Sequence, residues 1–175
     1  MIGWNRISGK LLVEQIKFNA IWSFFSRFYS TKSKNTTSYK FVFLRSIFEN
    51  IYNFDENLTI PIDMLFVKFT EIYWNLVVLI GLKQHSTKSS VESELKKIVT
   101  RDTIPNISFE SLTNTQKNHI IKEITLVGKQ YVIGAVYGDF EGSMYSFNKK
   151  LGFLTLSKDY FRFIQNHNSV LLKNK

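Results

Sequence analysis

Residues 61–81, PIDMLFVKFTEIYWNLVVLIG, form a nearly continuous apolar stretch that decides the fold. Within it, Lys68, Glu71 and Asn75 recur at i, i+3 and i+7, which places them on one stripe of a helix. The rest of the helical circumference is apolar. The leading proline suits the first turn of a helix, and the closing glycine suits its end. A helix that is apolar around most of its girth is buried on most sides. The sequence therefore predicts a central helix surrounded by the rest of the chain.

Similar patterns before and after this stretch predict further helices. Residues 9–29 and 39–52 carry apolar side chains at helical spacing. Ser89 and Thr113 are each followed three positions later by Glu or Gln, the capping box that opens a helix. Gly128 is placed to end the helix that Thr113 opens.

The apolar period changes near the C-terminal end of the sequence. Two short apolar runs flank a polar, glycine-containing turn, which predicts a β-hairpin at about 144–156. Ser157 can then cap a last helix. Residues 131–137 fit a short helix or a strand equally well.

These elements together predict a mainly α fold, a helical bundle with one short β-hairpin near the C-terminal end. We expect two parts. Residues 1–37 form an amphipathic, basic N-terminal helix and linker, and residues 38–175 form a single helical domain that contains the hairpin.

Composition limits the class of protein. A hydrophobic content of 44% over 175 residues is enough for a packed core and argues against global disorder. Charged residues interrupt the most apolar stretch, so we expect no integral membrane protein. Cysteine is absent, which excludes disulfides and thiolate metal sites and fits a reducing cytoplasm. We therefore expect a cytoplasmic protein.

The net charge points to an anionic partner. The formal charge is +9 at pH 7, and basic chains of this size meet nucleic acid, anionic membranes or acidic proteins. Basic residues near both ends of the sequence are interleaved with aromatic ones. Such cations neutralise phosphates while aromatic faces stack on unpaired bases. The predicted nucleic-acid-binding residues are Arg27, Lys32, Lys34, Lys40, Arg45, Lys149, Lys150 and Arg162. The alternative is that the aromatic residues form the core and the lysines only solubilise the surface.

Catalytic and metal-binding motifs give no comparable signal. The three histidines form no HExxH or HxH pattern, and no glycine-rich phosphate loop is present. Glu94-Leu95-Lys96 and the acidic pair Asp139 and Glu141 are the nearest match to a magnesium-dependent nuclease site. A solvent-facing helix and a turn explain them more simply. We predict no catalytic residue, no metal and no cofactor.

Several segments carry a resemblance to a known family. They are residues 38–47, 60–75, 109–123 and 144–156. Their hydrophobic pattern and order resemble the helical N-terminal region of bacterial HNH-type endonucleases of the restriction and phage-defence kind. The catalytic His-Asn-His finger of that family is absent, and the triplet 166–168 is not such a motif. The resemblance implies that a nuclease module lies beyond residue 175 or on a partner chain.

Three functional hypotheses follow. The leading one is a non-catalytic DNA-interaction or regulatory domain of a restriction or defence-type nuclease system, which meets DNA and a nuclease or other protein partner. The second is a protein-interaction or oligomerisation module that docks through its aromatic N-terminal helix, on a partner or on a second copy. Its docking residues are Ile21, Trp22, Phe25 and Phe28. The third is a nuclease whose site is assembled from distant residues.

Overall fold

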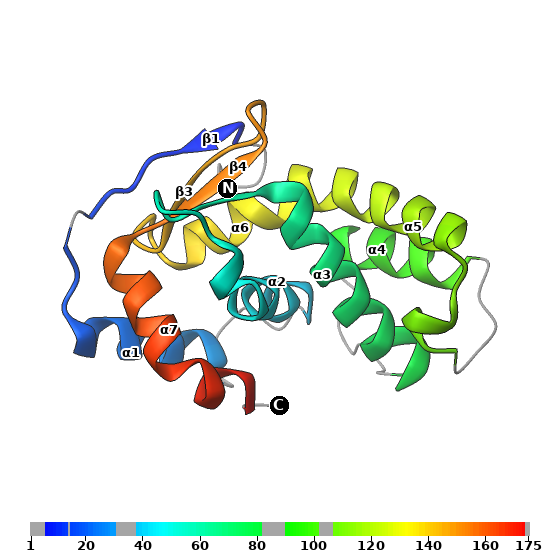
Figure 1. Cartoon of the computed structure of the whole chain (residues 1–175), viewed down its shortest axis with the longest axis horizontal. Coiled ribbons are helices and arrows are strands. Elements are labelled where there is room, and N and C mark those ends of the chain that lie inside the picture. The colour runs from blue at the N-terminus through cyan, green and yellow to red at the C-terminus, as the bar shows by residue number, and fades with distance from the viewer. Residues whose placement is uncertain (1–5, 14, 31–37, 82–89, 102–106, 174–175) are drawn as a thin grey trace.

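Helices dominate the fold, as the sequence predicts, and a small antiparallel sheet lies beside them (Figure 1). The computed structural model describes residues 6–13, 15–30, 38–81, 90–101 and 107–173. The α-helices are α1 (Phe18–Tyr29), α2 (Ser38–Glu49), α3 (Ile62–Trp74), α4 (Ser90–Thr100), α5 (Asn114–Val127), α6 (Ile133–Asp139) and α7 (Lys158–Lys173). The shorter helical turns are η1 (Ile51–Asn53), η2 (Asn75–Leu79), η3 (Phe109–Ser111) and η4 (Gly128–Val132). The strands are β1 (Ser8–Gly9), β2 (Thr59–Pro61), β3 (Tyr145–Asn148) and β4 (Phe153–Leu156).

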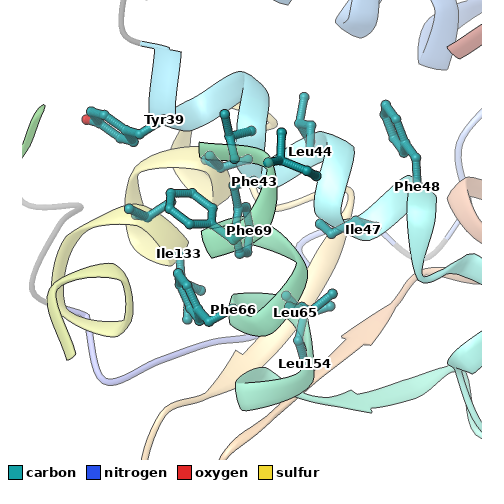
Figure 2. Close-up of a cluster of buried hydrophobic side chains, with 14 of the residues drawn as sticks. Tyr39, Phe43, Leu44, Ile47, Phe48, Leu65, Phe66, Phe69, Ile133 and Leu154 are labelled. Atoms are coloured by element: carbon teal, nitrogen blue, oxygen red, sulfur yellow. The ribbon is translucent and has the colours of Figure 1, made fainter. Parts of the chain in front are cut away.

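The central helix is confirmed. Helix α3 packs against α2 and α5, and most of its side chains are buried. Figure 2 shows Phe43, Phe66 and Phe69 gathered where α2 meets α3, with Ile133 and Leu154 beside them. The rings of Phe43 and Phe66 lie 5.8 Å apart between centroids, and those of Phe66 and Phe69 lie 5.3 Å apart. Aromatic packing therefore joins α2 to α3, and Phe43 of α2 also contacts Tyr145 of β3, with ring centroids 6.2 Å apart.

Helix α3 does not end at residue 74 but continues as the π-helix η2, and Gly81 with φ of +70° follows it. This confirms Gly81 as the stop. In contrast, the prediction that Gly128 ends the helix opened by Thr113 is wrong. The chain continues through the π-helix η4 into α6, so residues 131–137 are helical. Position 128 needs glycine, because a Cβ at this position would lie 2.0 Å from Cε1 of Phe66.

The helix predicted over residues 9–29 begins only at Phe18. The chain before it is extended, because its backbone is bonded to distant segments. Strand β1 pairs with β3, and the backbone N–H of Leu12 donates to the carbonyl oxygen of Gly142 at 3.0 Å. The backbone N–H of Ile16 donates to the Asp159 carboxylate at 2.8 Å. From Phe18 onwards, α1 packs against α7.

The predicted hairpin is confirmed as β3 and β4, within a four-stranded sheet of order β1-β3-β4-β2. All pairs of strands are antiparallel. Strands β1 and β2 were not predicted, because two or three residues are too short to show an alternating period. The sheet covers the N-terminal end of α3 and the α6 segment (Figure 1).

Two of the predicted helix caps are confirmed. Thr113 and Gln116 form a reciprocal capping box at the start of α5. The Ser157 hydroxyl accepts the backbone N–H of Tyr160 at 3.3 Å at the start of α7. The capping box at Ser89 lies outside the described residues. Within the described residues, no helix has both the length and the apolarity needed to cross a bilayer.

Candidate nucleic-acid interface

The turn between β3 and β4 presents two of the predicted cations, Lys149 and Lys150. The side-chain oxygen of Asn148 accepts the backbone N–H groups of Lys150 and Leu151, each at 3.0 Å. Gly152 has a φ of +79°, a conformation that glycine adopts without strain. These local bonds close the turn and hold the two lysines at the end of the hairpin.

A third cation, Arg6, reaches the same place from the start of the chain. Ser8 pairs with Asn148, and the backbone N–H of Lys149 donates to the carbonyl oxygen of Ile7 at 2.9 Å. Arg6 directly precedes Ile7, so it reaches the same end of the sheet as the β3–β4 turn. We call Arg6, Lys149 and Lys150 the hairpin cluster.

Two cations of the hairpin cluster, Arg6 and Lys149, lie over aromatic rings. The guanidinium of Arg6 lies 5.6 Å from the ring centroid of Tyr137, and Lys149 Nζ lies 5.8 Å from that of Phe147. Lys149 Nζ also donates to the carbonyl oxygen of Gln130 at 3.0 Å. Burial lowers the pKa of Lys149 to about 8, so its ammonium is charged at neutral pH and loses its proton in mildly alkaline solution.

Apolar side chains are exposed next to these charges. Leu151, between Lys150 and Gly152 in the turn, is 67% exposed, and Phe153 at the start of β4 is 38% exposed. An exposed aromatic face beside cations is the arrangement on which unpaired bases stack. The hairpin end therefore presents cationic side chains together with exposed apolar ones.

Lys40 does not lie at the surface. Its side chain is 10% exposed, and its ammonium lies 2.8 Å from Oδ2 of Asp139 and donates to Oδ1 at 3.1 Å. Lys40 was predicted to bind nucleic acid, but the fold places it in a buried ion pair, because α2 is buried around most of its circumference and an ion pair is what keeps a charge there.

The other described candidates do not join the hairpin cluster. Arg27 donates to the Glu141 carboxylate at 2.9 Å and lies over the Phe24 ring. Arg45 donates to Glu49 at 2.8 Å within α2, and Arg162 is exposed on α7. The hairpin tip stands away from α1 and α7 in Figure 1. Lys32 and Lys34 lie outside the described residues.

Among the predicted residues that the structure describes, Lys149 and Lys150 are the two that lie together, and Arg6, which sequence reasoning missed, lies at the same end of the sheet. Nothing in the sequence marks Arg6, because its position depends on a two-residue strand pairing with β3 from across the chain.

The described residues contain no group of three or more His, Cys, Asp or Glu side chains placed to hold a metal ion. Asp139 and Glu141, the predicted acidic pair, form ion pairs with Lys40 and Arg27. His119 lies 3.7 Å from Glu123 in an exposed network on α5 that links to α4. These contacts explain the acids as structural groups.

The aromatic face of α1 is used within this chain. Ile21, Phe25 and Phe28 are buried in the core, so a partner could not reach them in the folded protein. The Trp22 ring packs edge-on against Phe163 at 4.8 Å between centroids. The contacts that the second hypothesis assigned to a partner are made by α7 and the neighbouring core.

Comparison with other proteins adds no assignment. No family model, no curated protein and no solved structure matches this chain.

Proposed function

We propose that this chain is a non-catalytic DNA-interaction or regulatory domain of a restriction or defence-type nuclease system, acting in the cytoplasm together with a nuclease module or partner protein. The observation that supports DNA contact is the hairpin cluster, in which Lys149 and Lys150 lie in the β3–β4 turn, Arg6 lies next to the Ile7 that bonds this turn, and Phe153 is exposed at the start of β4. The nuclease setting rests on the resemblance of the helical pattern to HNH-type endonucleases.

Charge and shape both favour this end of the molecule. A chain with a net charge of +9 attracts polyanions over a distance, and a cationic tip gives the encounter a place to dock. Lysine and arginine bind phosphate oxygens regardless of base sequence. The expected interaction is therefore with the DNA backbone, strengthened by stacking wherever the strands are open.

The test is the salt dependence of DNA binding. We expect the triple variant Arg6→Gln, Lys149→Gln, Lys150→Gln to bind labelled duplex and single-stranded DNA more weakly, as measured by fluorescence anisotropy. If each cation contacts one phosphate, the wild type should lose about fortyfold more affinity than the variant between about 50 and 200 mM salt.

A matched control removes the same charge elsewhere. Lys96 and Lys97 on α4 and Lys122 on α5 are exposed and lie on helices away from the hairpin. Replacing these three by glutamine should leave most of the salt slope in place. Equal losses in the two triple variants would show that net charge alone, and no defined interface, attracts DNA.

The lowered pKa of Lys149 predicts two opposite trends as the pH rises, one in the stability of the protein and one in its DNA affinity. In the unfolded chain this lysine titrates near its ordinary value of about 10.4, whereas in the folded protein it titrates at about 8. Between these values the unfolded state holds more protons, so the free energy of unfolding rises with pH. Over the same range the folded protein loses a cation, so DNA affinity falls.

Urea unfolding and anisotropy at about pH 7.5 and 9.5 measure both trends. We expect the wild type to gain stability and lose DNA affinity relative to Lys149→Met, which has no proton to release at this position. A flat difference between the two proteins across this range would contradict the buried environment of Lys149.

A further inference from the structure

A pocket of about 530 Å³ lies between α1, α2, the α3–η2 helix and the end of α7. Its walls are largely apolar, with Phe41, Val42, Ile72, Leu76 and Leu171 among the lining residues. This volume falls within the range of sites that bind small molecules. The pocket is separate from the hairpin cluster and shares no residue with it.

Two hydrogen-bond donors, Arg45 and Tyr29, are among the residues that line this apolar pocket. Arg45 uses its Nε to bond Glu49 at 2.8 Å, and among the described residues nothing is bonded to its two Nη groups. The Tyr29 ring stacks on Phe41 with centroids 5.4 Å apart, and its hydroxyl has no hydrogen-bond partner in the described part of the chain. Both residues line the pocket.

The polar groups of the pocket offer a ligand hydrogen-bond donors. Tyr29 is 37% exposed as a residue, yet burial around its phenol raises the pKa to about 12 against the opposing charge of Arg45. The hydroxyl is therefore a donor at neutral pH. The lining acid Glu71 accepts from Lys68 at 2.7 Å, and Glu49 has Lys68 at 3.7 Å in addition to Arg45. Both acids therefore already have a cationic partner, whereas the two Nη groups of Arg45 can still donate hydrogen bonds.

One wall of the pocket departs from regular helix. The π-helix η2 supplies lining residues Asn75 and Leu76, and the Asn75 side-chain oxygen accepts the backbone N–H of Phe109 at 3.2 Å. A π-helical turn is less favourable than α-helix and recurs at functional sites. Here it lies in the wall of the pocket, and its Asn75 side chain is bonded to Phe109 of η3.

We propose that this pocket binds a small amphipathic carboxylate, with its apolar body against Val42, Ile72 and Leu76 and its carboxylate bonded by the Arg45 guanidinium and the Tyr29 hydroxyl. Such a ligand matches each part of the site. The apolar walls exclude water from the body, and a planar guanidinium bonds a carboxylate through two parallel N–H groups.

The test compares octanoate with 1-octanol, which has the same chain length and no charge. Methyl NMR spectra of the full chain follow Val42, Ile72, Leu76 and Leu171 during each titration. We expect octanoate to shift these methyl signals and to bind more tightly than 1-octanol. In Arg45→Gln, octanoate affinity should fall about tenfold while 1-octanol affinity is unchanged.

Further variants keep the test decisive. Tyr29→Phe removes only the hydroxyl and should weaken octanoate by a smaller factor without disturbing the fold. Arg162→Gln, an exposed arginine on α7, is the matched control and should bind octanoate as the wild type does. DNA affinity should be unaffected by Arg45→Gln, which separates this site from the proposed function. The proposal is overturned if octanoate leaves these methyl signals in place, or if Arg45→Gln weakens both probes equally or neither.

Discussion

Replacing Gly128 with alanine is expected to lower the free energy of unfolding by about 2 kcal/mol or more. Alanine favours helix over glycine by up to about 1 kcal/mol, so propensity alone predicts the opposite sign. The packing decides against it. A Cβ at this position would lie 2.0 Å from Cε1 and 2.4 Å from Cζ of Phe66. Phe66 is fully buried between Phe43 and Phe69, so its ring has no free space to enter.

Gly138 provides the matched control, because it also lies within a helix, α6. No atom outside its own helix would come within 4 Å of a Cβ there. Gly138→Ala should therefore raise the free energy of unfolding, by about 0.5–1 kcal/mol. Urea unfolding of both variants measures the contrast. Two shifts of the same sign would mean that the close contact at Gly128 does not decide its stability.

A double variant tests whether overlap with the Phe66 ring causes the loss of stability in Gly128→Ala. In the Gly128→Ala background, Phe66→Leu should be less destabilising than in the wild type, since the smaller side chain relieves the overlap while leaving a cavity. Additive effects of the two substitutions would place the strain elsewhere.

Gly128 also illustrates where sequence reasoning stops. Local rules read a glycine after an apolar helical run as a helix end, and at Gly81 this is right. At Gly128 the same residue type serves a close approach between α3 and η4, so the helix continues. The difference lies in a neighbour 62 positions earlier in the chain, which no local pattern contains.

The elements that the sequence predicts well are those with a long period or an explicit cap. The apolar run of α3, the capping box at Thr113 and the β3–β4 hairpin all meet this condition. Strand β1 does not, because its residues become a strand only by pairing with β3. The chain before α1 also takes its conformation from distant partners, so its apolar spacing wrongly predicts a helix there.

Charged residues can be counted from the sequence, but their positions in the fold cannot be predicted from it. The clustering of basic residues towards both ends is real, yet it includes a side chain buried in the core, Lys40, and others bonded to acids, such as Arg27. Only the lysines placed by a tight turn could be assigned to the surface in advance, and their partner Arg6 could not.

Replacing Lys40 with methionine is expected to lower the free energy of unfolding by about 3 kcal/mol. The side chain of Asp139 is 16% exposed, and removing Lys40 leaves this carboxylate in the interior without its ion pair. Burial raises the pKa of the Tyr145 phenol well above its usual value, and the nearby Asp139 carboxylate adds to this rise. Urea unfolding measures the loss, and the folded variant should bind DNA like the wild type.

The matched control for Lys40→Met is Arg45→Met on the same helix. Arg45 pairs with Glu49 at a similar distance, 2.8 Å, but its side chain is 41% exposed, so the loss should stay below about 1 kcal/mol. Adding Asp139→Leu to Lys40→Met should restore part of the lost stability, because removing both charges avoids the uncompensated carboxylate. If Lys40→Met instead weakens DNA binding and leaves stability unchanged, Lys40 belongs to the interface and not to the core.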